Sequence, residues 1–257
     1  MSGLLVARRG SLNPRRVAAP VGDAYADEVL ADSPFAWWRF EETSGSTVAD
    51  EVGSNDGTVF GANLDVAGQV GSGASFDGVD DYINVGSLSG LSWGGSNGFT
   101  VEMLVNTTDS TSDAMFFGAI NTSGTTFLNQ GSWSRTGGFL TFAMAHPGTS
   151  NSNRKITRGS TAADSIADGA WHHLAFVAPG GTAALKIYLD GVDDTGLVRE
   201  NASVSATSFP SSLFLCARNF NGSASDFNEA IQDEVAIYDK ALSAARILAH
   251  AQAAGVA

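Results

Sequence analysis

The stretch from Asp50 to Gly57 offers the kind of oxygen atoms that bind a hard cation. Asp50 supplies a carboxylate and Asn55 an amide oxygen, while Gly53 and Gly57 let the backbone turn its carbonyl groups inward. Calcium prefers oxygen ligands of this kind from a tight turn. The alternative is a loop that is closed by Asx turns and binds nothing. The sequence therefore predicts a structural calcium site here, with the self-bonded loop as the competing interpretation.

A second group of acids, Asp77, Asp80 and Asp81, lies close together around Gly78. Carboxylates at this spacing could also approach a cation. A glycine among aspartates between two apolar runs is, however, typical of a tight turn. We therefore interpret this stretch as a glycine-containing hairpin turn.

The histidines and the cysteine do not form a recognisable catalytic or metal site. His172 and His173 are neighbours in a predicted strand, so their side chains point to opposite faces and could not ligate one metal. His146 and His250 have no partner in view. Cys216 lies in an apolar run, where a buried, inert thiol is expected and an intramolecular disulfide is impossible. These residues favour packing over chemistry.

Short apolar runs separated by turn residues must position these groups. The chain has 257 residues with 30 glycines, and Asn, Ser, Thr and Asp crowd between the apolar segments. This texture is typical of many strands joined by many turns. The predicted strands are 36–40, 57–60, 74–77, 81–85, 99–106, 114–121, 138–145, 171–178, 184–190, 212–217 and 230–238. The stretches 86–98 and 146–165 are predicted to be exposed loops.

Three local patterns sharpen this prediction. Between residues 99 and 105 every second residue is apolar, which gives a strand with one buried face. Asp190 and Gly191 follow an alternating run and form a strong hairpin signal. Near the end of the sequence, Ser243 can cap the N-terminus of a helix. The apolar residues Leu242, Ile247 and Leu248 would dock this segment on a sheet.

Charge divides the chain into a basic arm and an acidic body. Residues 1–28 contain Gly and Pro without a sustained apolar period, and their basic residues are Arg8, Arg9, Arg15 and Arg16. The formal net charge of the whole chain is −13. An acidic body repels nucleic acid and anionic membranes, so neither is a predicted partner of it. No secretory signal and no apolar stretch long enough to span a bilayer are apparent.

Seven short motifs occur in an order that resembles the laminin G-like modules of the concanavalin A-like lectin/glucanase superfamily. They lie at 33–42, 50–57, 75–83, 99–102, 171–175, 188–191 and 233–238. The string SFDGVDDYI at 75–83 carries most of the resemblance. The resemblance implies an all-β, two-sheet antiparallel jelly-roll sandwich over residues 29–257, with an extended N-terminal arm at 1–28 and a short C-terminal helix.

The resemblance also has implications for chemistry. In such modules a structural cation often ties an early loop to the late acidic strand, which adds Asp233 to the predicted calcium ligands. Glucanases of this superfamily carry three acids on one strand in a Glu-x-Asp-x-x-Glu pattern, which no strand here offers, so we expect no enzymatic activity. For glycan binding, Trp133 with Arg135 and, second, Trp93 are the candidates, because sugars stack on aromatic rings beside polar groups. The competing interpretation places both tryptophans in the core.

The arm suggests a setting for the sandwich. A basic arm on an acidic body, without an export signal, predicts a phage virion surface or decoration protein of the capsid, tail or fibre. It would be made in the host cytoplasm and anchored to other virion proteins through the arm, in a homo-oligomeric or symmetric assembly. The sandwich would be displayed outward and would bind cell-surface glycans. The alternative is an extracellular carbohydrate-binding or adhesion module of a bacterial surface protein.

Overall fold

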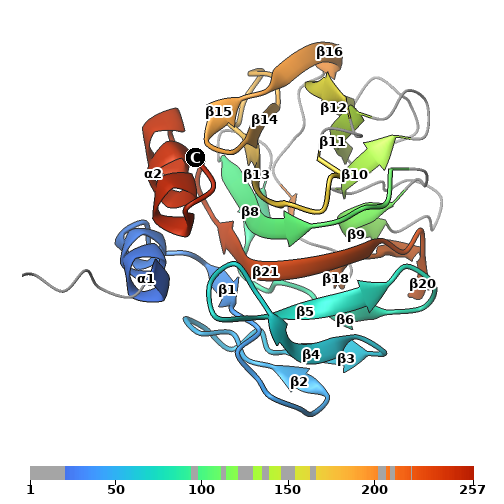
Figure 1. Cartoon of the computed structure of the whole chain (residues 1–257). Helices are drawn as coiled ribbons and strands as arrows, with labels where there is room; N and C mark the ends of the chain where they lie inside the picture. The colour runs from blue at the N-terminus through green and yellow to red at the C-terminus, as the bar shows by residue number, and fades with distance from the viewer. Residues whose placement is uncertain are drawn as a thin grey trace, which may run out of the picture.

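A computed structural model describes the chain from residue 21 to residue 257, apart from short gaps (Figure 1). The gaps are 94–97, 111–113, 121–129, 135–138, 146–153, 163–165, 202–206, 209–211 and 221. The four arm arginines, Arg135 and His146 therefore lie outside the described residues.

Two antiparallel sheets form the sandwich, and we call the one that carries the helices the back sheet. Its eight strands follow the order β15-β14-β13-β8-β21-β5-β4, and β1 pairs with β21 beside this path. Their bounds are β1 Ala36–Trp38, β4 Asn63–Ala67, β5 Ser72–Asp77, β8 Phe99–Asn106, β13 Trp171–Ala178, β14 Lys186–Leu189, β15 Val192–Asp193 and β21 Glu229–Tyr238. The first and last strands of the sandwich are thus hydrogen-bonded neighbours.

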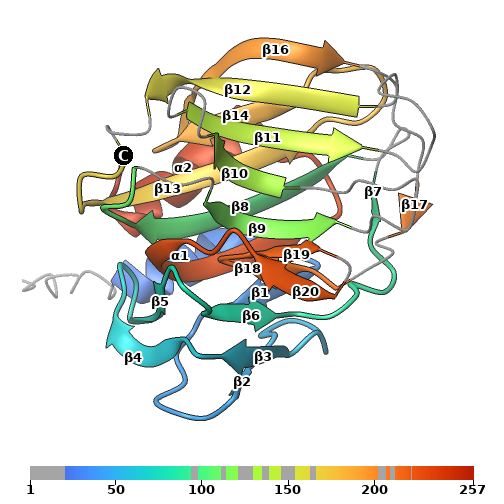
Figure 2. The same ribbon diagram turned by 90° about the vertical axis from the view of Figure 1, so that its right-hand side faces the viewer.

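The other layer, the front sheet, has eleven strands (Figure 2). Its main path runs β16-β12-β11-β10-β9-β18-β6-β3-β2, and β19 pairs with β9 and β20. The bounds are β2 Thr47–Val48, β3 Gly57–Phe60, β6 Tyr82–Asn84, β9 Met115–Ile120, β10 Gln130–Ser134, β11 Phe139–Ala145, β12 Arg154–Ala162, β16 Thr195–Asn201, β18 Phe214–Leu215, β19 Arg218–Phe220 and β20 Ser223–Ser225. A separate two-stranded ribbon joins β7 (Ser92–Trp93) to β17 (Thr207–Ser208).

The main hydrophobic core fills the space between the sheets. The predicted alternation of β8 is confirmed, because Phe99, Val101, Met103 and Val105 all belong to this core. Aromatic rings from both sheets meet there at 5.4–5.9 Å between centroids, with edge-to-face geometry that favours ring packing. Cys216 is buried in the same core, and burial raises the pKa of its thiol.

Two helices cover part of the outer face of the back sheet (Figure 1). Helix α1 spans Val21–Ala31 and α2 spans Ala244–Ala254. The predicted cap is confirmed, since the Ser243 side chain accepts a hydrogen bond from the Arg246 amide, and Gly255 ends the helix in the left-handed conformation. Leu242 and Ile247 are buried as expected, but Leu248 is exposed and Ala251 takes its place.

Several boundaries differ from those that the sequence predicts. Residues 21–28, assigned to the extended arm, form most of helix α1, because Tyr25 and Val29 lie one turn apart and are both buried. The predicted loop 146–165 contains strand β12, which pairs with β11 and β16. Asp190 and Gly191 form the predicted two-residue hairpin turn, and both have the positive φ that such a turn requires. Neither described helix has the length and apolar character that a membrane span needs.

Candidate functional site

The loop after Asp50 is held together by its own hydrogen bonds. Asp50 Oδ1 accepts from the Trp37 amide at 3.0 Å and the Val52 amide at 3.3 Å. Its Oδ2 accepts from the Asn55 amide at 3.0 Å and from the Asn55 side chain at 2.8 Å. Both oxygens thus already have N–H donors, which compete with any cation for the same lone pairs.

The two glycines of this loop have packing reasons of their own. A Cβ atom on Gly53 would lie 2.5 Å from Asp50 Oδ2, and one on Gly57 would lie 2.7 Å from a Val48 methyl group. Side chains at either position would therefore displace the carboxylate or the core. The glycines allow close approach of the backbone, whether or not a cation binds.

Asp233 lies at a bulge in β21, beneath the helices. The pairing of β21 with β8 shifts between Asp233 and Ala236, and Glu234 has a φ of +53°. Such a bulge sets two residues against one on the partner strand. Asp233 Oδ2 accepts a hydrogen bond from the Val70 amide at 2.9 Å, and its buried Oδ1 has no partner among the described residues. Burial, and then the neighbouring Glu234 carboxylate, raise the pKa of Asp233 to about 8.

Glu234 is the other acid of the bulge and has a full set of donors. The Trp37 indole donates to it at 2.7 Å, and the Arg39 guanidinium donates at 3.0 and 2.9 Å. Burial is the largest influence on Glu234 and raises its pKa to about 7, although Arg39 opposes this. The bulge thus carries two buried acids with raised pKa values.

The predicted calcium ligands Asp50 and Asp233 accept hydrogen bonds from different segments of the chain. Asp50 is bound by its own loop, whereas Asp233 is bound by the turn between β4 and β5. A ligating carboxylate must be deprotonated, which the raised pKa of Asp233 disfavours. Asp50 does not fit a cation without losing N–H donors, and only the unpartnered oxygen of Asp233 fits one.

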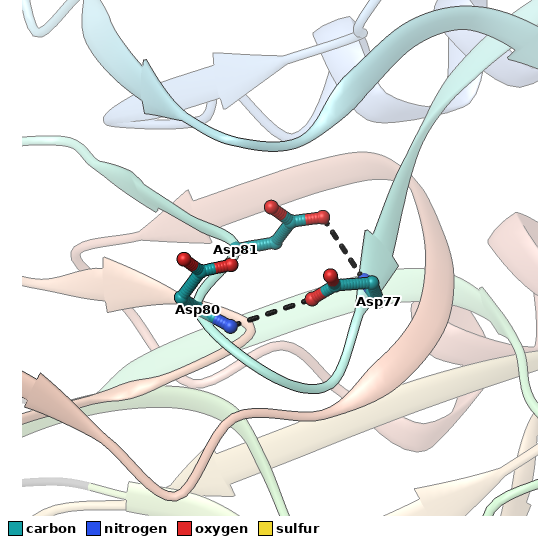
Figure 3. Close-up of side chains that lie close together, drawn as sticks. All are labelled: Asp77, Asp80 and Asp81. Atoms are coloured by element: carbon teal, nitrogen blue, oxygen red, sulfur yellow. Dashed lines mark hydrogen bonds between the residues drawn. The ribbon is translucent and has the colours of Figure 1, made fainter.

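The acids Asp77, Asp80 and Asp81 lie at the turn from β5 to β6 (Figure 3). Their carboxylate oxygens approach one another within 4.8 Å, and this is the one such cluster of three in the described part of the chain. Asp77 Oδ1 accepts from the Val79 amide at 2.8 Å, and Asp81 Oδ2 accepts from the Asp77 amide at 3.0 Å. The turn is as predicted, but it is not a hairpin, because β5 and β6 belong to different sheets.

The predicted glycan-binding tryptophans are placed only by their backbones. Trp133 lies in β10 opposite Leu140 of β11. Trp93 lies in β7 opposite Thr207 of β17. Their side chains, like Arg135, lie outside what the structure describes, so their role in glycan binding stays a prediction.

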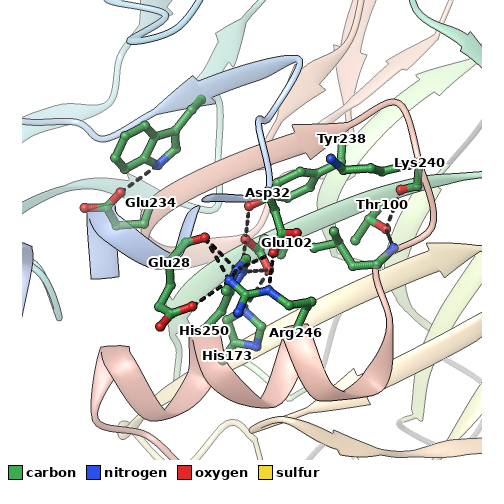
Figure 4. Close-up of polar contacts among 12 residues, drawn as sticks. Glu28, Asp32, Thr100, Glu102, His173, Glu234, Tyr238, Lys240, Arg246 and His250 are labelled. Carbon is green, nitrogen blue, oxygen red and sulfur yellow. Dashed lines mark hydrogen bonds and ion pairs between the residues drawn. The ribbon is translucent and has the colours of Figure 1, made fainter. Parts of the chain in front are cut away.

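A buried polar cluster under the helices is the largest feature that the sequence did not reveal (Figure 4). It centres on Glu102, which points from β8 toward the helices and is fully buried. Its Oε1 accepts from the Tyr238 hydroxyl at 2.5 Å and lies 2.8 Å from His250 Nδ1, while Oε2 lies 3.2 Å from His173 Nε2. Burial alone would raise the pKa of Glu102, but His250 and His173 outweigh it and hold the pKa well below its usual range.

The cluster continues outward and joins the two helices. Arg246 of α2 binds Asp32, which follows α1, at 2.6 Å and Glu28 of α1 at 2.5 Å. His250 Nε2 lies 3.1 Å from the Asp32 carboxylate. Burial would lower the pKa of His250, but the carboxylates around it raise it instead. We call this set of contacts the helix clasp; it binds both ends of the described chain to the back sheet.

The clasp corrects one statement made from the sequence and supports another. His250 has partners, and its partner Glu102 is 148 residues away in the chain. The only local signal is that Glu102 is an acid in a mostly apolar strand, where a buried acid needs a partner. His173 packs against Glu102 while His172 binds Asp190 at 2.8 Å, so the two neighbours serve different faces as predicted.

Comparisons with known proteins show which family the chain resembles. The family model of the concanavalin A-like lectin/glucanases superfamily matches residues 77–248. No curated protein matches significantly. Domain 4 of AbnA, an extracellular arabinanase from Geobacillus stearothermophilus solved with arabinotriose, is 22% identical with a TM-score of 0.55, and the match covers 85% of this chain and 98% of that domain.

Toxin binding domains have similar structures. The binding domain of Paraclostridial Mosquitocidal Protein 1 is 14% identical with a TM-score of 0.62, over 85% of this chain. A botulinum neurotoxin type C structure, described as entering cells through two ganglioside molecules, is 14% identical with a TM-score of 0.60, over 88% of this chain. This chain spans about half the length of either, 52%. The matched family model, the seven ordered motifs and the two-sheet sandwich together establish that the chain belongs to the concanavalin A-like lectin/glucanase superfamily.

Proposed function

We propose that this chain is a non-enzymatic, lectin-like module that binds carbohydrate. The observation that carries the proposal is the likeness of this chain to domain 4 of the arabinanase, a domain that was solved in complex with arabinotriose. The match covers 85% of this chain and 98% of that domain, so the likeness concerns the whole module. The superfamily to which the chain belongs takes its name from lectins as well as glucanases.

The burial of three strand acids removes these three as possible catalysts. Glycoside hydrolysis needs a pair of carboxyl groups that flank the scissile bond. Glu102, Asp233 and Glu234 are fully buried. Each of them is engaged in contacts that hold the protein together, so none can reach a bound sugar. The sandwich thus offers binding surface without these acids as catalysts.

Glycan binding and turnover are tested together. The chain is screened against an array of neutral and acidic glycans, and hits are measured by calorimetry and by product analysis after long incubation. We expect reversible binding without products. Absence of binding across the array would contradict the proposal, and released sugar would contradict its non-enzymatic part. The variant Trp133→Ala tests whether the front sheet carries the site.

We also propose that the module is displayed on a phage virion and anchored by its basic arm. The support is the contrast in charge: the segment 1–16 has four arginines and no acid, whereas the chain as a whole has a net charge of −13. An extracellular adhesion module of a bacterial surface protein is the alternative. The test is to locate the chain in purified particles and to compare deletion of residues 1–20 with replacement of the four arginines by glutamate. Both variants should fold but fail to assemble; normal assembly would contradict anchoring by the arm.

Calcium remains a proposal with one supporting observation, the unpartnered Oδ1 of Asp233. Melting temperatures with calcium, with magnesium and with a chelator provide the test. A rise that needs calcium and is lost in Asp233→Asn would support the site. An unchanged melting temperature would leave the loop after Asp50 as the self-bonded alternative.

A further inference from the structure

The outer face of the back sheet has an open half that the helices do not cover. There a cavity of about 400 Å³ lies over the ends of β5, β8 and β21. We call it the outer groove. Six of its lining residues carry the argument: Ser75, Asp77, Asn106, Thr108, Glu229 and Ile231. They come from three strands and the segment that follows β8, so the groove is built mainly on sheet rather than on mobile loops.

The strand register aims these side chains outward together. Ser75 pairs with Ile231, which pairs in turn with Asn106, and Asp77 pairs with Glu229. Paired residues of neighbouring strands point to the same face. The residues between them, Phe76 and Ala230, belong to the core on the other face. The groove therefore presents a hydroxyl, an amide, an aliphatic side chain and two carboxylates in adjacent rows.

The next strand extends the first row with an aromatic residue. Trp171 of β13 pairs with Asn106 and is partly buried against the hydrophobic cluster on this face of the sheet. Asn106 is also held in place, because its side chain donates to the Gly169 carbonyl at 2.7 Å. A row of aromatic, amide, aliphatic and hydroxyl groups matches the alternating apolar and polar faces of a sugar.

The charge of the groove selects among sugars. None of the described residues that line it is basic, and two of them are acids. Carboxylates accept strong hydrogen bonds from sugar hydroxyls but repel carboxylates of sialic or uronic acids. From this lining we infer that the outer groove binds neutral oligosaccharides and excludes acidic ones. The inference rests on the proposed carbohydrate-binding function and names its location and ligand class.

The first experiment compares neutral sugars with an acidic one, sialyllactose, in which lactose carries an added sialic acid. Lactose, arabinotriose and the best neutral ligand from the array are titrated into the full chain beside sialyllactose. Neutral ligands should bind, and sialyllactose should bind at least about tenfold more weakly, since each 1.4 kcal/mol is a factor of ten in affinity. Equal or tighter binding of sialyllactose would overturn the charge selection.

Substitutions then test the location. Asn106→Ala and Glu229→Gln should each weaken binding of the neutral ligand by about tenfold. Glu51→Gln is the matched control, because Glu51 is an exposed acid in the loop beside β1 and makes the same change of charge. Thermal melts confirm that all variants fold. Unchanged binding in both groove variants, with loss in Trp133→Ala, would overturn the outer groove while leaving carbohydrate binding in place.

A gain of binding excludes misfolding as the explanation. Glu229→Lys replaces an acid of the groove by a base and should increase affinity for sialyllactose, whereas Glu51→Lys should not. No gain in Glu229→Lys would contradict the assignment. If the wild type binds no glycan at all, the proposed function fails together with this inference.

Discussion

The two halves of the outer face of the back sheet treat their acids in opposite ways. Under the helices, Glu102, Asp233 and Glu234 are fully buried and bound by other side chains or by the backbone. In the outer groove, Asp77 and Glu229 are exposed. The same strands, β8 and β21, run through both halves. The same sheet thus buries acids where the helices cover it and exposes acids where the helices do not.

The largest effect should come from the centre of the helix clasp. Glu102→Gln removes the negative charge that balances the buried histidines and the Tyr238 hydroxyl. Removing one partner of a buried ion pair typically costs about 3–5 kcal/mol, because the other charge stays buried. We expect a loss of that size in urea unfolding. A loss below about 1 kcal/mol would mean that the helix clasp does not stabilise the folded state. The contrast between the two halves of the sheet would then fail.

The two acids at the bulge of β21 predict that the free energy of unfolding depends on pH. The expected effect is slightly smaller than that of Glu102→Gln. The pKa values are raised to about 8 for Asp233 and about 7 for Glu234, from ordinary values of 3.8 and 4.5. The folded protein therefore holds protons that the unfolded chain has released, so this stabilisation is complete below the ordinary values and is lost as pH rises toward 8. Glu102 acts in the opposite direction, since its lowered pKa removes stability only in acid.

The variant Asp233→Asn isolates the contribution of Asp233 to the pH dependence of stability. One pKa unit corresponds to about 1.36 kcal/mol. Between mildly acidic and mildly alkaline pH we expect the wild type to lose on the order of 3 kcal/mol relative to the variant, measured by urea unfolding at each pH. If the two proteins follow parallel pH profiles, Asp233 does not hold a proton in the folded state.

The outer contacts of the clasp should matter less. Arg246 binds Glu28 and Asp32, but its side chain is one-third exposed, so solvent screens both pairs. We expect Arg246→Ala to cost about 1 kcal/mol and to speed amide hydrogen exchange in α1 selectively. Arg158→Ala is a control outside the clasp. Unaltered exchange in α1 would show that Tyr25 and Val29 alone dock this helix.

The smallest effect should come from the open half. Glu229→Gln changes an exposed acid and should alter the free energy of unfolding by less than about 0.5 kcal/mol. The same substitution type at Glu102 and Glu229 thus compares the two halves directly. A large destabilisation by Glu229→Gln would mean that the groove acids are structural and would weaken their assignment to binding.

The sequence predicted those parts of the molecule that depend on local pattern. The alternation in β8, the Asp190–Gly191 turn and the Ser243 cap each follow from a few neighbouring residues, and all three are confirmed. Helix α1 was missed because two buried residues, Tyr25 and Val29, give too weak a period after a proline and a glycine. Strand β12 was missed because polar and small residues dominate its sequence and give no apolar alternation, and its pairing with β11 and β16 outweighs that local preference.

The candidate sites depend even more than the fold on contacts that a local sequence pattern does not encode. Asp50 was identified as a candidate ligand, but the N–H donors that its carboxylate accepts from follow from the geometry of the loop. The clasp depends on a contact between residues 102 and 250, and no local pattern encodes a pairing across that separation. The outer groove likewise exists only through the register of three strands that are distant in sequence.

The pairing of β1 with β21 has a mechanical consequence. Ala36, where the chain enters β1, lies opposite Ile237, where it leaves β21. A tension applied between the two chain ends would therefore peel this pair apart one hydrogen bond at a time, which is the weak direction for a sheet. The ion pairs between α1 and α2 lie outside that first hydrogen bond and would bear the load before it. The contacts between α1 and α2 would therefore have to separate before tension at the chain ends could open the pair of β1 and β21.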